Sequence, residues 1–168
     1  MLKHKIATLT KYNNDIYFLL FDNAWDAGMR FLRAQEHYES TNEKFHNKRF
    51  KLLDYIEWYA KEHENEFTYA NDWSGFNVPD YILERVYVGG RHENNRYDLF
   101  MRNVIRIIKK NSQKPYYLIG TSLESKFDAL DHEIAHGLWH VNKDYHDLQL
   151  ANVYNLSEKM YDRLCKNL

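Results

Sequence analysis

The sequence predicts an α+β fold, a helix-rich single domain over residues 1–168 with a small β-sheet. Two observations support this fold class. Apolar residues recur at helical spacing in several long segments, whereas short uninterrupted apolar runs, such as residues 16–21, are typical of buried strands. The chain also shows no internal repeat, no low-complexity tract and no linker, and it holds only 2 Pro and 6 Gly. A second domain is therefore not expected.

The first half of the chain is expected to form a β segment, three helices and an ordered loop. Residues 5–21 favour β structure, and Asp22 then stands where the N-cap of a helix would be. A second helix is expected over residues 49–63. The aromatic stretch 67–80 is interpreted as a loop because Gly, Asn and Pro interrupt it, and a short helix over residues 81–87 follows.

The second half is expected to be mainly helical. Residues 97–111 make the clearest amphipathic helix, with an apolar stripe and basic side chains over the rest. A short β-like run over residues 116–120 comes next. Thr121 and Glu124 have the spacing of a capping box, which predicts a helix that ends at about residue 141. A last helical stretch is expected over residues 146–167.

The charge balance and the single cysteine limit the possible partners and setting. The chain holds 23 basic and 24 acidic residues, so we expect no broad attraction to nucleic acid or to an anionic membrane. The longest apolar run is far shorter than the ~20 residues of a membrane span, and no secretory signal is recognised. Cys165 has no partner for an intramolecular disulfide, which favours a reducing, cytoplasmic setting.

The chemistry-bearing motif is DHEIAHGLWH, in which His132, Glu133 and His136 form an HExxH sequence. Residues four apart on a helix share one face, with Cβ atoms ~5–6 Å apart, so two imidazoles can bind one metal ion. Neutral imidazole nitrogens suit Zn²⁺ and leave a position for water, beside which Glu133 would act as general base. The sequence therefore predicts a zinc site with His132 and His136 as ligands.

The surroundings of the motif favour a functional helix. Five apolar side chains define one buried face, namely Phe127, Leu130, Ile134, Leu138 and Val141. The histidines lie on the opposite side, which lacks the Lys, Arg and Glu of an ordinary surface and carries Ser125, Ala129, Trp139 and His140. We therefore expect this helix to be covered on both sides, with a cleft above the histidines.

This segment resembles the active-site helix of the zincin metallopeptidases. The resemblance implies that His132 and His136 are zinc ligands, that Glu133 is the catalytic base and that the substrate is a peptide or protein. A fainter resemblance covers most of the chain and is to small uncharacterised proteins of phages, viruses and bacteria. It is carried by the segments RAQEHYES, FTYANDWSGFNVP, YYLIG and HEIAHGLWHVNKDY.

The sequence departs from two zincin clans at the third zinc ligand. A metzincin-like pattern has a glycine and then a third histidine after the motif, but Trp139 and Asn142 occupy those positions, which excludes this clan. A gluzincin-like pattern places a glutamate roughly twenty residues beyond His136, and Glu158 comes slightly later than that. Glu158 could instead belong to a capping box that begins at Asn155.

Four other residues are further candidates for the third ligand. Asp144 and His146 follow an expected left-handed helix stop and could turn back toward the motif. Glu36 and Glu39 continue an apolar stripe and are expected to be half-buried, where a carboxylate needs a partner. A salt bridge to an arginine is the simpler interpretation for these two. His140 lies ~9 Å along the helix axis from the midpoint of the two histidines, too far to be a ligand.

The motif leaves two main classes of function. The first is a zinc-dependent hydrolase, a metallopeptidase that uses zinc-bound water with Glu133 as general base. The alternative is a non-catalytic interaction or accessory protein of the phage type, in which HExxH is structural or accidental. A metal-binding protein without turnover is a third interpretation.

Overall fold

The computed structural model describes residues 7–13, 15–89, 93, 95–112, 115–125, 130–156 and 160. Within these residues the chain forms seven helices and four strands. The helices are α1 (Ala24–Glu39), α2 (Leu52–Glu62), α3 (Tyr69–Asp72), α4 (Asp80–Tyr87), α5 (Arg96–Asn111), α6 (Leu130–Val141) and α7 (Lys143–Tyr154). The predicted fold class, α+β and helix-rich with a small sheet, is confirmed.

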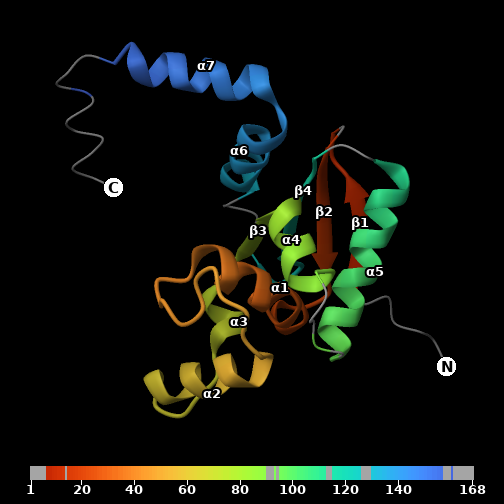
Figure 1. The fold of residues 1–168 in the computed structure, drawn as a ribbon, viewed down its shortest axis with the longest axis vertical. Coiled ribbons are helices and arrows are strands. Elements are labelled where there is room, and N and C mark those ends of the chain that lie inside the picture. The colour runs from red at the N-terminus through yellow and green to blue at the C-terminus, as the bar shows by residue number, and fades with distance from the viewer. Residues whose placement is uncertain are drawn as a thin grey trace.

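The strands are β1 (Ala7–Lys11), β2 (Ile16–Phe21), β3 (Gly75–Pro79) and β4 (Tyr117–Ser122). They form one mixed sheet in the order β1-β2-β4-β3 (Figure 1). β1 and β3 are antiparallel to their neighbours, whereas the two central strands, β2 and β4, are parallel. Strands covered on both faces carry continuous apolar runs, which explains the apolar sequence of β2.

Helices pack on both faces of the sheet. Leu19 and Phe21 of β2 belong to the main core, which they share with α1, α4 and α5. Ile16 points to the other face and packs, together with Tyr117 and Ile119 of β4, against α6. The two-residue period of a strand produces this division. The sheet is therefore the platform that positions α6.

The stretch 67–80 is not a loop, so this expectation was wrong. It forms the short helix α3 and then the edge strand β3, which pairs with β4 so that Gly75 lies opposite Thr121. Phe76 and Val78 point into the main core. Pro79 ends the strand, a position where its missing N–H costs least. Strand pairing with a distant segment therefore overrides the local turn signals.

Two expected helix boundaries also need correction. Asn23, not Asp22, caps α1, because its side chain accepts a hydrogen bond from the N–H of Asp26. Thr121 opens no helix: it lies in β4 and donates its hydroxyl to the carbonyl of Ser74 at 3.0 Å. Glu124 instead accepts a hydrogen bond from the N–H of Ala24 at 2.9 Å, at the start of α1. A polar residue whose sequence spacing predicts a local helix cap can instead form a hydrogen bond with a distant backbone group.

The C-terminal region starts differently from the prediction. Asn142 was expected to stop a helix in the left-handed conformation, but its φ is −119° and its side chain caps α7 by accepting from the N–H of Tyr145. α7 therefore begins at Lys143 rather than at residue 146. Residues 157–159 and 161–168 lie outside the described part of the chain, so the structure makes no statement about Glu158 or Cys165.

Candidate metal centre

α6 lies on the sheet through one face only. Ile134, Leu138 and Val141 are partly buried against the sheet. Gly137 is the buried residue of the helix, and a Cβ atom there would lie 2.9 Å from the side chain of Ile16. The absence of a side chain at this position lets the helix approach the sheet closely. Three of the five side chains predicted for the buried face are thereby confirmed; Phe127 lies outside the described residues.

The two histidines of the motif lie side by side on α6. The Nε2 atoms of His132 and His136 are 3.0 Å apart, and the ring planes meet at 80°. The two nitrogens thus lie within hydrogen-bond distance of each other on the same face of the helix. Both residues are exposed, as is Trp139, so the expectation that this side of the helix is covered was wrong at these three positions. α7 contributes no buried side chain that would cover them.

Glu133 points toward the edge strand β3. Its Oε1 atom lies 3.9 Å from the position that a Cβ atom would take at Gly75, and its Oε2 atom is buried without a hydrogen-bond partner among the described residues. Burial raises the pKa of the Glu133 carboxyl group, and the two histidines and the amide of Asn77 oppose this shift. The carboxylate is thus half-buried, with its Oε2 atom shielded from water.

Two residues beneath Glu133 were not recognised from the sequence. Tyr117 of β4 donates its hydroxyl to the amide oxygen of Asn77 on β3. Both side chains are buried. Burial raises the pKa of the Tyr117 hydroxyl, and the nearby charges of Glu39 and Glu133 raise it further. Only the pairing of β3 with β4 brings these residues together, so no local pattern in the sequence could reveal them.

Glu39 is the third-ligand candidate whose charge acts on the motif. Loss of hydration raises the pKa of its carboxyl group; the hydrogen bond from Gln35 and the charge of His136 lower it, while Glu133 and Glu36 raise it. Glu39 ends α1, which packs on β3 and β4. Across the described ranges, no group of three His, Cys, Asp or Glu side chains is already arranged to hold a metal ion.

Glu36 and His146 are engaged elsewhere, and Asp144 is exposed. Glu36 is buried, with 6% of its surface exposed, and its carboxylate accepts the Tyr69 hydroxyl at 2.9 Å rather than pairing with an arginine, as had been expected. Asp144 is exposed on α7. His146 hydrogen bonds to Asp147 and packs its ring against Trp139, at 4.2 Å between centroids.

His140 has a structural partner. Its Nε2 atom lies 3.0 Å from Oδ1 of Asp80, which begins α4, and its ring packs near Tyr81 and Tyr117. Burial opposes ionisation of Asp80, but the hydrogen bonds from His140 and from the backbone of Tyr81 outweigh it and lower the pKa of Asp80. His140 therefore links α6 to α4, in agreement with its exclusion from the ligand set.

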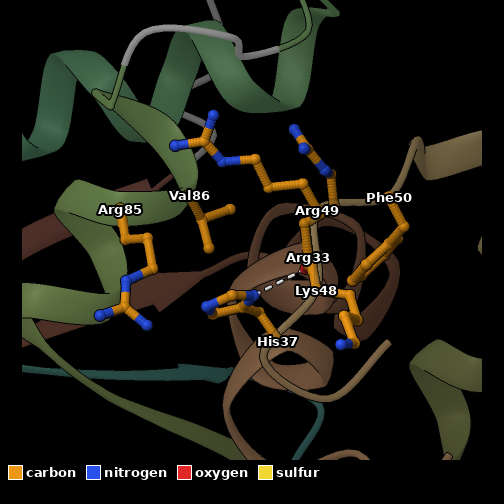
Figure 2. Close-up of a pocket in the computed structure, with 7 residues that line it drawn as sticks. All are labelled: Arg33, His37, Lys48, Arg49, Phe50, Arg85 and Val86. Atoms are coloured by element: carbon orange, nitrogen blue, oxygen red, sulfur yellow. Dashed lines mark hydrogen bonds between the residues drawn. The ribbon is translucent and has the colours of Figure 1, made fainter. Parts of the chain in front are cut away.

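A second cluster of titratable side chains lies where α1, the segment 48–50 and α4 meet, and is shown in Figure 2. The ring of His37 lies among basic side chains and its Nδ1 atom bonds the carbonyl of Lys48 at 2.7 Å. Arg33 pairs with the buried Asp98, and Arg49 donates to the carbonyl of Gly89. The space among them is about 10 Å³, which is barely enough for one water molecule and too small for a substrate.

The described helices include none that is long and apolar enough to cross a membrane. Comparison of the chain with known protein families, with curated proteins and with solved structures finds no match.

Proposed function

We propose that this protein is a zinc-dependent hydrolase that acts on peptide bonds, with His132 and His136 as zinc ligands and Glu133 as general base. The observation that carries the proposal is the convergence of the two Nε2 atoms, 3.0 Å apart, beside a carboxylate whose Oε2 is buried without a described partner. The preference for peptide bonds comes from the resemblance of DHEIAHGLWH to the zincin helix.

The donor set suits zinc. Two nitrogen atoms that bind one tetrahedral zinc ion at ~2.0–2.1 Å lie about 3.3 Å apart, close to the separation of the two Nε2 atoms. When bound, the ion acts as a Lewis acid and lowers the pKa of a coordinated water to ~7. The two imidazoles also need to be neutral to bind it, and both face solvent, from which the ion can enter.

Glu133 supplies the proton acceptor. A general base works best when its pKa lies near the working pH, and burial raises the pKa of Glu133 in that direction. Its carboxylate accepts the proton of the attacking water and delivers it to the amine that leaves. Asn77, which Tyr117 holds in place, is the side chain positioned to orient this carboxylate from β3.

We propose Glu39 as the side chain that completes the ligand set. Its support is its place at the end of α1, a helix that packs on β3, the strand that α6 also contacts. Glu39 is exposed at the end of α1, and its carboxylate would exchange the hydrogen bond from Gln35 for the metal. We further propose a reducing, cytoplasmic setting, consistent with the lone Cys165.

The test is the pair of variants Glu133→Gln and Asp131→Asn. We expect wild-type protein to hold one zinc per chain after dialysis and to cleave peptides. Glu133→Gln should keep the zinc and lose hydrolysis by about 10²–10⁴-fold, the usual contribution of a general base. Asp131, an exposed carboxylate of the same helix turn, serves as the matched control, and its substitution should leave zinc content and activity unchanged. Elemental analysis and a peptide-cleavage assay measure both quantities.

Three outcomes contradict the proposal. A folded wild-type protein that takes up no added zinc makes the histidine pair a structural contact and favours the non-catalytic accessory protein. Full hydrolysis by Glu133→Gln shows that the activity arises elsewhere. Zinc content without any peptide cleavage leaves a metal-binding protein and also rejects the hydrolase.

A further inference from the structure

A cavity of about 290 Å³ lies where the C-terminal end of α1 meets α2 and α3. These three helices lie beside one another in Figure 1. This volume is close to the lower end of the ~300–1,000 Å³ range of ligand cavities, and about ten times the ~30 Å³ that a water molecule occupies in the liquid. It is therefore large enough for one amino-acid side chain, and its walls indicate which kind.

Three carboxylates line this cavity, namely Glu36, Glu39 and Asp72. No lysine or arginine is found among the described residues of its wall. None of the ion pairs among the described residues includes one of these carboxylates. The cavity thus carries a concentration of formal negative charge, and its described wall offers only the ring of His63 and no lysine or arginine.

The hydrogen bonds to these carboxylates come from neutral groups. Glu36 accepts the hydroxyl of Tyr69 at 2.9 Å, and Asp72 accepts the hydroxyl of Tyr59. A neutral donor supplies a hydrogen bond but cannot balance the charge of a buried carboxylate. Glu36 is only 6% exposed, so a cationic ligand in the cavity would meet a carboxylate that bulk water hardly screens.

Gln35 adds a second, independent observation. This residue lines the cavity and is 98% buried, with 2% of its surface exposed. Its amide nitrogen donates to Glu39 at 2.7 Å, which leaves its Oε1 atom to accept from another group. That oxygen is buried and has no hydrogen-bond partner among the described residues. A buried acceptor of this kind indicates a ligand with N–H donors.

The rest of the wall is aromatic. Tyr55 packs edge-on against Tyr69, with ring centroids 5.6 Å apart, and Trp58 and Trp73 complete the sides. Aromatic faces attract organic cations, and an inorganic divalent ion gains nothing from them and prefers oxygen ligands and water. The combination of carboxylates with aromatic walls therefore favours an ammonium or guanidinium group on an aliphatic stem.

The cavity and the candidate metal centre share one side of the molecule. Glu39 lines the cavity at the end of α1, and both α1 and α6 pack on β3. Trp73, also in the wall, directly precedes the turn into β3, where Gly75 lies next to the Glu133 carboxylate. An extended peptide whose side chain enters the cavity would therefore pass close to Glu133.

We propose that this cavity is a specificity pocket for a lysine or arginine side chain of the peptide substrate. The cation lies between Glu36 and Asp72, its N–H groups reach Gln35, and its aliphatic stem packs on the aromatic wall. This inference rests on the proposed peptide hydrolysis, because a specificity pocket needs a peptide substrate. Binding of the cation itself requires neither zinc nor Glu133.

The test compares N-acetyl-L-arginine N-methylamide with the N-acetyl-L-citrulline analogue, which has nearly the same shape and no charge. Binding is measured by calorimetry and by the fluorescence of the cavity tryptophans. We expect wild-type protein to bind the arginine compound about tenfold or more tightly than the citrulline compound. Glu36→Gln and Asp72→Asn should each weaken arginine binding, whereas Glu57→Gln on α2, outside the cavity wall, should not.

The outcomes separate this inference from the proposed hydrolase. Arginine-selective binding by a protein that holds no zinc keeps the cavity assignment and removes the hydrolase. Zinc-dependent hydrolysis with equal or no binding of the two probes overturns the cavity assignment alone. Displacement of the arginine compound by Mg²⁺ or Ca²⁺ at comparable affinity also overturns it, because the cavity is then a metal site. If Glu36→Gln does not fold, the exposed Asp72 provides the decisive variant.

Discussion

Asp80 and His140 form the polar link between α4 and the candidate helix. Asp80 begins α4. Its carboxylate accepts hydrogen bonds from the Nε2 atom of His140, in the last turn of α6, and from the N–H of Tyr81 in its own helix. A carboxylate at a helix N-terminus is also stabilised by the helix dipole. These interactions favour the ionised form, which is why the pKa of Asp80 is lowered despite its partial burial.

We predict that ionisation of Asp80 makes the free energy of unfolding depend on pH in the acid range. A lowered native pKa contributes stability above the unfolded value of about 3.9, and this contribution is lost as pH falls through the native pKa. Urea unfolding of wild type and Asp80→Asn should therefore show wild type to be the more stable at pH 7, with the difference shrinking below about pH 4. A difference independent of pH would show that the lost stability is not electrostatic.

At the scale of the elements, the packing of α1 on the sheet depends on a glycine in β4. A Cβ atom at Gly120 would lie 2.2 Å from the ring of Phe31. Phe31 is fully buried, and its ring stacks on that of Phe76 with centroids 5.3 Å apart, so it cannot move aside. The close approach of helix and strand at this point exists because Gly120 has no side chain.

Substitution of Gly120 should accordingly be costly. We predict that Gly120→Ala lowers the free energy of unfolding by about 1–3 kcal/mol or more, as overpacked cores do. Gly75→Ala in the neighbouring strand is the control, because its Cβ atom would have no described atom closer than 3.7 Å, and its effect should stay within about 0.5 kcal/mol. Denaturant unfolding measures both. Equal losses for the two variants would show that glycine flexibility, rather than space, decides the effect.

At the scale of the whole molecule, α7 contributes little to the core. It has no buried side chain, and it packs on α6 at the end of the molecule opposite α2 and α3 (Figure 1). The sheet, α1, α4 and α5 hold most of the buried apolar residues. The candidate centre is therefore built on the stable part of the fold, with α7 as an addition at its C-terminal side.

Truncation tests this arrangement and the third ligand together. We predict that a chain ending at Asn142 unfolds cooperatively, with stability within about 1 kcal/mol of wild type, and binds zinc as wild type does, because Glu39 and both histidines remain. A chain ending at Tyr154 is the control that keeps Asp144 and His146. Loss of zinc from both chains would point to Glu158 instead, and loss from the shorter chain alone to α7.

The sequence predicted the long helices and the central strands well because their signals are local. The apolar period of α5 and the unbroken run of β2 depend only on residues a few positions apart. The edge strand β3 was missed because its strand character comes from pairing with β4 rather than from its own residues. Thr121 was assigned to a capping box for the same reason: its hydroxyl finds a distant carbonyl.

For the candidate centre, the sequence by itself determined which residues share one helix face. His132, Glu133 and His136 follow from the helical repeat alone. Only the tertiary structure decided that Glu133 faces β3 and that α1, which ends at Glu39, packs on the same strand. It also decided that three carboxylates meet aromatic rings in one cavity. Residues on one helix are related by fixed geometry, whereas residues far apart in the chain meet only after every element has packed.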